Sequence, residues 1–125
     1  MNFLRYIRNS SGSVAVEFAL LLPVYIFFMF GIIEFGRYIW TRNTMEFAAE
    51  IAARYGAITS GATDATVAAY ALTQLIGISS TGITFTATVA ASTVTVVGTT
   101  TFSSVITNYV PIVSKTITVT ATFAK

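Results

Sequence analysis

Glu17 is the residue whose chemistry most needs an explanation, because it stands alone at the start of a long apolar run. From Phe18 to Ile33 the chain carries no charged residue. A carboxylate beside lipid is costly unless it is paired, so such groups are rare and tend to have a partner. Two interpretations stay open. Glu17 is either solvated at a membrane interface near a helix N-terminus, where the helix dipole favours it, or held by a specific cation.

Other reactive side chains are scarce. The chain has no Cys and no His, which excludes disulfides, thiolate nucleophiles, imidazole bases and the usual transition-metal sites. Ser114 and Lys115 are neighbours, but adjacent side chains on a strand point to opposite faces. Glu46 and Glu50 would be the only paired acids, and they share an exposed helical face with Arg54. We therefore expect no catalytic residue, no metal and no cofactor.

The apolar run has the length of a membrane span. Its sixteen residues, Phe18 to Ile33, would extend about 24 Å as a helix, against about 30 Å for the hydrocarbon core of a bilayer. The flanking segments Val14 to Val16 and Phe35 to Trp40 lengthen it. The sequence therefore predicts one transmembrane helix.

The order of the features before this helix is unusual. Arg5, Arg8 and the small-residue junction Gly12–Ser13 all precede the apolar run, whereas a secretory signal places its cleavage site after its apolar region. The first two arginines favour a cytoplasmic N-terminus, although Arg37 and Arg42 on the other flank make the count of basic residues equal. The count of basic residues alone therefore does not decide which end of the chain is cytoplasmic.

Gly12, followed five positions later by Glu17 and then by an unbroken apolar helix, is similar to the processing region of type IV pilin precursors. The longer sequence Gly-Ser-Val-Ala-Val-Glu-Phe-Ala-Leu-Leu-Leu-Pro of residues 12–23, continued by Phe-Gly-Ile-Ile-Glu-Phe-Gly-Arg of residues 30–37, resembles the TadE-type pseudopilins. These are minor pilins of the tight-adherence (Tad, type IVc) pilus systems. The resemblance covers Arg8 to Ala53, and beyond that it rests on strand-rich character and on the segment Tyr109-Val110-Pro111.

The resemblance implies a processing step. A prepilin peptidase would cut between Gly12 and Ser13 and remove residues 1–12 as a leader. The new α-amino group would lie one helical turn before Glu17 and could neutralise its carboxylate, on its own helix or on a neighbour's. Such a pair would fix the axial register between subunits.

The resemblance and the composition together define the expected organisation. The 125 residues are one domain's worth at most. We expect a leader at 1–12, a transmembrane and assembly helix at 13–40, and an extracytoplasmic domain at 41–125. Pro23 removes a hydrogen bond inside the helix and crowds the carbonyl of Ala19, which predicts a kink or an unwound turn.

The extracytoplasmic domain is expected to begin with helices. The first helix should continue to about residue 55 and end at Gly56. A second helix is expected over 63–76, with Thr63 and Asp64 as candidate N-caps. The residues expected to face the core are Phe47, Ile51 and Tyr55 on the first helix and Val67, Ala71 and Leu75 on the second.

From residue 82 to 124 the periodicity changes to two, which is typical of antiparallel strands with one buried face. The alternating stretches, in which Thr occupies every second position, are Ile83–Val89, Thr93–Val96 and Thr116–Phe123. A further strand is expected near Thr101 to Ile106, and a loop with Pro111 over Asn108 to Val113. We attribute the Thr ladders to β propensity rather than to ice or glycan binding. The predicted fold is α+β, like that of a type IV pilin.

The leading hypothesis is therefore a structural pseudopilin that takes part in Tad pilus assembly and surface adhesion. The resemblance implies four partners: the prepilin peptidase, other pilin helices, the inner-membrane assembly platform and the membrane itself. It places the chain in the inner membrane, with its C-terminal domain outside the cytoplasm, or at the cell surface in the pilus. The alternative is an unprocessed single-span envelope protein whose β-rich outer domain docks onto another component.

An enzyme or a nucleic-acid-binding protein fits the sequence poorly. The net charge is only +2, and the basic residues form no stripe on one face, which nucleic-acid binding would require. No Gly-rich phosphate loop is present either.

Overall fold

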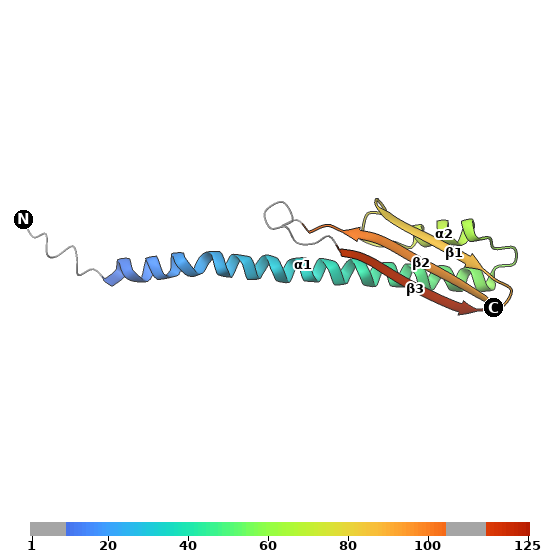
Figure 1. Cartoon of the computed structure of the whole chain (residues 1–125), viewed down its shortest axis with the longest axis horizontal. Coiled ribbons are helices and arrows are strands. Elements are labelled where there is room, and N and C mark those ends of the chain that lie inside the picture. The colour runs from blue at the N-terminus through green and yellow to red at the C-terminus, as the bar shows by residue number, and fades with distance from the viewer. Residues whose placement is uncertain (1–9, 105–114) are drawn as a thin grey trace, which may run out of the picture. The chain divides into compact units, whose positions relative to one another are not determined.

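The computed structural model describes residues 10–104 and 115–125. Its elements are α1 (Ser10–Ile58), α2 (Asp64–Thr73), β1 (Ile83–Val89), β2 (Thr93–Phe102) and β3 (Lys115–Ala124), which Figure 1 labels. A long apolar helix, a short helix and an antiparallel sheet confirm the predicted α+β class. Arg5, Arg8 and the expected loop over 108–113 lie outside the described residues.

The chain forms two compact units, Met1–Phe35 and Gly36–Lys125. The described part of the first unit is entirely α1, which begins at Ser10 rather than at residue 13. The helix continues without a break on both sides of Pro23. This continuity excludes the unwound turn, and the kink stays a prediction.

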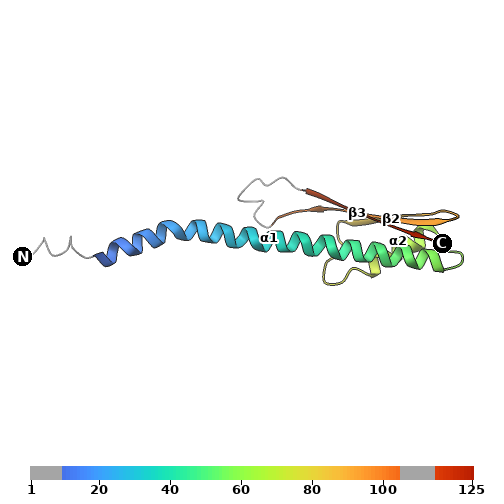
Figure 2. The same cartoon turned by 90° about the horizontal axis from the view of Figure 1, so that it is seen from below.

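The second unit has two layers. Its sheet has the order β1-β2-β3, with both neighbouring pairs antiparallel. Within this unit, Figures 1 and 2 show the end of α1 and all of α2 on one side of the sheet. Apolar residues point toward the helices and threonines point away, as the period of two predicts. The other face of the sheet is therefore hydroxyl-rich and wet.

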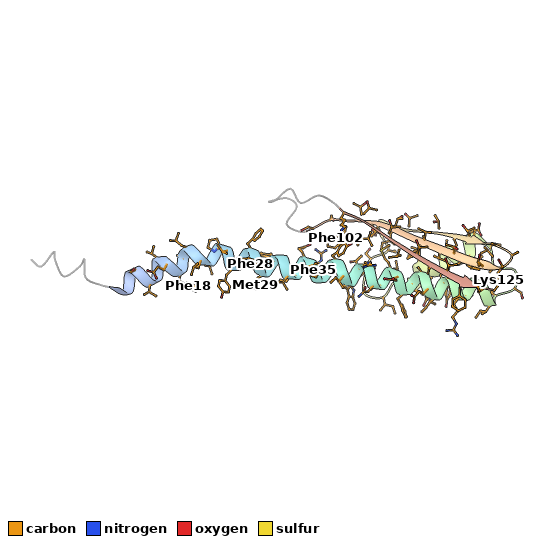
Figure 3. The ribbon with its side chains drawn as sticks, turned by 60° about the horizontal axis from the view of Figure 1, so that its bottom comes forward. Phe18, Phe28, Met29, Phe35, Phe102 and Lys125 are labelled. Atoms are coloured by element: carbon orange, nitrogen blue, oxygen red, sulfur yellow. The ribbon has the colours of Figure 1, made fainter. Side chains whose placement is uncertain are left out.

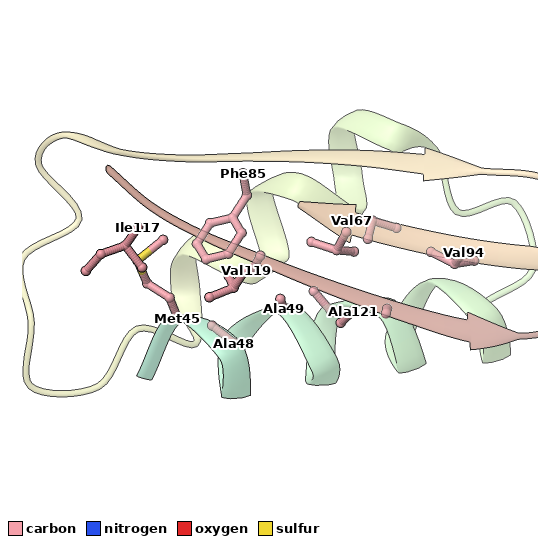
Figure 4. Close-up of a cluster of buried hydrophobic side chains, with 13 residues drawn as sticks. Met45, Ala48, Ala49, Val67, Phe85, Val94, Ile117, Val119 and Ala121 are labelled. Atoms are coloured by element: carbon pink, nitrogen blue, oxygen red, sulfur yellow. The ribbon is translucent and has the colours of Figure 1, made fainter. Parts of the chain in front are cut away.

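Four alanines and one methionine line the buried side of α1 in this unit. The buried positions recur every three or four residues: Met45, Ala48, Ala49, Ala52 and Ala53. Figure 4 shows the first three below the apolar side chains of the strands. Methyl groups allow the sheet to approach the helix closely, and larger side chains at these positions would hold it away.

The core face predicted for this part of α1 is correct only for Tyr55, which packs against the core cluster. Phe47 is 48% exposed, and Ile51 and Tyr55 are only half-buried. Phe47 and Ile51 line an open cleft together with residues 120–123 of β3.

On α2, Val67 and Ala71 are both fully buried, as predicted. Leu75 also packs against the core, but it lies beyond the helix, which ends at Thr73 and is shorter than the predicted 63–76.

A capping box begins α2 and ties it to the sheet. The Thr63 hydroxyl accepts a hydrogen bond from the Thr66 backbone N–H, while the Thr66 hydroxyl accepts one from the Thr63 backbone N–H. Asp64, in the first turn, accepts a hydrogen bond of 2.7 Å from the backbone N–H of Val89. Thr63 is thus the N-cap, and Asp64 anchors the helix to the end of β1.

Gly98 lets β2 pass beneath an aromatic ring. It lies between Phe85 and Val119 in the strand register. A Cβ atom at Gly98 would come within 2.5 Å of the Phe85 ring and 2.9 Å of a Val119 methyl. With the ring in that space, β2 runs unbroken from Thr93 to Phe102. The separate strand expected near Thr101–Ile106 was therefore wrong at its start, since Thr101 belongs to β2.

Replacing Gly98 with Ala should destabilise the second unit. The added methyl must displace Phe85 or Val119, and overpacking of this kind costs about 1–3 kcal/mol. The measurement is thermal unfolding of the full chain in detergent, followed by circular dichroism. Gly36→Ala is the control, since nothing lies within 4 Å of a Cβ there. Equal melting temperatures for both variants would contradict this packing.

Candidate functional site

The described part of the first unit is an apolar helix whose side chains are exposed. Every described residue from Gly12 to Ile33 is exposed, including Leu20 at 72%. Figure 3 shows Phe18, Phe28 and Met29 projecting outward from the ribbon. Because burying one such side chain is worth about 1.5–3 kcal/mol, water is a poor environment for this segment.

This helix fits a single-pass membrane protein. Within the described residues, one helix is long and apolar enough to cross a membrane, and it spans Gly12–Ile58 near the N-terminus. A shallow groove of about 250 Å³ on its surface is lined only by apolar side chains. They are Ile26, Met29, Phe30 and Ile33. Such a surface suits lipid chains or the side chains of another helix equally well.

Ser13 and Glu17 are in contact on the exposed helix surface. The Ser13 hydroxyl donates a hydrogen bond of 3.2 Å to Glu17 Oε1. Their spacing of four residues places them one turn apart on the same face. The carboxylate therefore points back toward residue 13, the side on which a new amino terminus would lie. The sequence reasoning missed the role of the hydroxyl, although the spacing could have indicated it.

Neither packing nor backbone geometry requires glycine at position 12. Gly12 lies within α1, and nothing lies within 4 Å of a Cβ built on it. Its φ is not positive, unlike those of Gly61, Gly77 and Gly82. A larger residue would fit there, so the fold gives no reason for this glycine. Pro23 is likewise exposed on α1.

The described residues contain no cluster of acids that could hold a metal ion. Glu50 and Arg54 are exposed and Glu46 is half-buried, as expected for the polar face of α1. Ser114 lies outside the described residues. The second unit does carry two open clefts, one of about 550 Å³ near the start of its helix and one of about 490 Å³ between Phe47 and Phe123.

Comparison with known families identifies the helix. Residues 12–54 match the family model described as TadE-like protein. The N-terminal helix of this chain is TadE-like. The match begins at Gly12, one residue before the expected cleavage point, and ends at Arg54. It confirms the resemblance drawn from the sequence.

The TadE-like match covers the apolar segment and the alanine-lined part of α1 but not α2 or the sheet. The TadE-like pilin family is structural, and it suggests a protein associated with the Tad pilus. No curated protein and no solved structure matches the chain.

A charge in the middle of the TadE-like helix should prevent membrane insertion. Ile26→Asp places a carboxylate near the centre of the apolar run, where it costs about 2.5–3.5 kcal/mol. Carbonate extraction of membranes should release this variant and retain the wild type. Ile58→Asp, the same change at an exposed position at the end of α1, should stay in the membrane. Retention of both variants would contradict a membrane span here.

Proposed function

We propose that this chain is a processed, membrane-inserted pilin-like subunit that takes part in building or priming a Tad pilus. The observation that carries the proposal is the exposed apolar surface of the TadE-like helix from Gly12 to Ile33. An apolar helix that the described part of the chain leaves exposed is stabilised by lipid or by other helices around it. The helix of a pilin-like subunit is surrounded by lipid in the membrane and later by other helices in the pilus.

The energetics of that exchange are nearly balanced. Lipid tails are as apolar as leucine side chains, so moving the helix from lipid into a bundle gains little hydrophobic free energy. Close packing and a few polar contacts must decide the association. Within the apolar surface, Glu17 is the group best suited to that role, because an unpaired carboxylate in apolar surroundings is strongly disfavoured.

The proposed partner of Glu17 is the amino terminus made by cleavage after Gly12. The Ser13–Glu17 contact supports this pairing, because it directs the carboxylate toward the residue that would carry the new ammonium. The ammonium of the same helix or of a neighbour could replace or join the hydroxyl. An ion pair in apolar surroundings is screened much less than one in water.

The remaining features follow from this assignment. A prepilin peptidase removes residues 1–12, and the helix then packs against other pilin helices at the inner-membrane assembly platform. The second unit lies outside the cytoplasm, where its hydroxyl-rich sheet prevents the chain from sinking into the bilayer. Surface attachment by the finished pilus is the expected biological role.

Processing predicts a mature protein that begins at Ser13. Intact-mass measurement of the protein extracted from membranes of its native host should show the loss of residues 1–12. Gly12→Leu should block this loss, because a small residue at the junction is required by the peptidase and not by the fold. Gly31→Leu is the control, since Gly31 is equally open. A full-length mass for the wild type would instead support the unprocessed envelope protein.

Loss of the carboxylate should separate cleavage from assembly. Glu17→Ala should be cleaved normally but reach sheared pili at about a tenth or less of the wild-type level, which corresponds to about 1.4 kcal/mol. Ser13→Ala removes only the hydroxyl and should assemble, whereas Glu17→Gln keeps an acceptor without the charge and should fail. Glu50→Ala is the control for the loss of a negative charge, because Glu50 is exposed and lies beyond the apolar segment. Normal assembly of Glu17→Ala would contradict the pairing.

A further inference from the structure

The bond that the proposed cleavage breaks lies inside a helix. α1 begins at Ser10, and both Gly12 and Ser13 belong to it, at the dark blue end of the chain in Figure 1. In an α-helix the carbonyl of residue 12 accepts a hydrogen bond from the N–H of residue 16. A peptidase attacks that carbonyl and binds its substrate as an extended segment, so the hydrogen-bonded helical form is a poor substrate. The turn over residues 12–16 must therefore open before the bond is cut.

In the described chain, no other element covers this turn. Every residue from Gly12 to Val16 is exposed, with Val14 at 65% and Val16 at 61%. The hydrogen bond of Ser13 is made to Glu17 of the same helix. A Cβ built on Gly12 would have nothing within 4 Å. Because packing does not hold these residues, their intrinsic helix propensity decides how often the turn opens.

The composition of the first two turns of α1 favours opening. Residues 10–16 are Ser-Ser-Gly-Ser-Val-Ala-Val, and among them only Ala15 is a strong helix former. The first turn also has no acidic residue that would interact favourably with the helix dipole. From Glu17 to Leu22 the sequence is Glu-Phe-Ala-Leu-Leu-Leu, in which every residue but Phe18 is a strong helix former. The helix is therefore weakest around the proposed cleavage point.

Glu17 limits how far the helix can open. In the uncut chain the α-amino group of Ser13 does not yet exist, so the Glu17 carboxylate is best stabilised by water at the membrane interface. The start of the 13–40 segment then lies in that interface, where water can bond to the freed backbone groups. Beyond Glu17 the opened backbone would face hydrocarbon, which offers no such partner. Opening is therefore confined to residues 10–16.

We propose that the first two turns of α1 open transiently and that the prepilin peptidase binds this open form. Gly12 then has a role that packing does not give it, because glycine weakens the helix at the bond to be cut. Val14 and Val16 are positioning residues, which act through the backbone conformation. Hydrolysis adds one water across the Gly12–Ser13 amide and leaves a carboxylate on Gly12 and an ammonium on Ser13. The inference rests on the processing proposed above and names what controls its rate.

Cleavage kinetics test the proposal, with the full chain in neutral detergent as substrate and the purified prepilin peptidase of the native host. Val14→Ala with Val16→Ala strengthens the helix and should lower kcat/KM about fivefold. The loss should appear in KM and not in kcat, because the apparent affinity falls with the population of the open form. Val14→Thr with Val16→Thr keeps the helix propensity and should be cut like the wild type. Equal kcat/KM values for the alanine pair and the wild type, or a loss confined to kcat, would overturn the proposal.

A rescue variant separates backbone opening from recognition of the valine side chains by the peptidase. Adding Ala15→Gly to the Val14→Ala, Val16→Ala pair lowers the helix propensity again without restoring either side chain. Its kcat/KM should return to within about twofold of the wild-type value. Val24→Ala with Ile26→Ala, a similar exchange at exposed positions beyond Glu17, should leave cleavage unchanged. Failure of the rescue would overturn the proposal, because the valines would then be recognised directly.

Hydrogen exchange of the same chain in detergent measures the opening without the peptidase. The amides of residues 14–16 should have protection factors at least tenfold lower than those of residues 20–22, and the alanine pair should raise them. Equal protection of the two segments would overturn the proposal. A wild type that exchanges as expected but stays uncut by the peptidase would refute the processing and not the opening. A wild type that is cut, with every variant cut equally fast, would refute the role of opening alone.

Discussion

An apolar helix that the described residues leave exposed is the constraint on which the rest of this structure depends. No described residue between Gly12 and Ile33 is buried, so the free energy of covering them must come from lipid or from other chains. Lipid and a helix bundle offer similar apolar surroundings. The helix can therefore move from lipid into a helix bundle with little change in hydrophobic free energy. The polar contact made by Glu17 then decides which neighbouring helices fit.

In the second unit, the end of the same helix is buried instead of exposed. There α1 presents alanines, and the sheet buries them by approaching closely, with Gly56 buried against Val67 and Val94. The result is a small core of aliphatic residues and Phe85, with threonines on the outer face of the sheet. One continuous helix thus carries an exposed apolar segment, which needs partners outside the chain, and a second segment whose apolar side chains are buried within the second unit. The TadE-like match extends over both.

The sequence predicted what depends on periodicity and local chemistry. The α+β class, the Thr63 cap and the inward side chains of β1 and β3 all follow from patterns within a few residues. What it did not predict depends on contacts across the fold. Large side chains at Phe47, Ile51 and Tyr55 suggested a core face, but the buried side chains on this part of the helix are those of one methionine and four alanines. A separate strand was expected near Thr101–Ile106, yet Thr101 belongs to β2, which runs on from Thr93 to Phe102 through Gly98. For the candidate site, Glu17 was predicted from the cost of a lone carboxylate beside lipid and Pro23 from its missing N–H, while the family pattern added the cleavage after Gly12. The contact of the Ser13 hydroxyl with Glu17 is seen only in the structure.

The most direct test of the central claim is to identify what surrounds the apolar helix in its native envelope. A photo-crosslinking amino acid in place of Phe28, which is 65% exposed, can be activated in isolated membranes and in sheared pili, and the adducts identified by mass spectrometry. We predict lipid adducts in membranes and adducts with the helices of other pilin subunits in pili. Adducts confined to residues 36–125 of the same chain would contradict the account, because the helix would then have its cover within its own molecule.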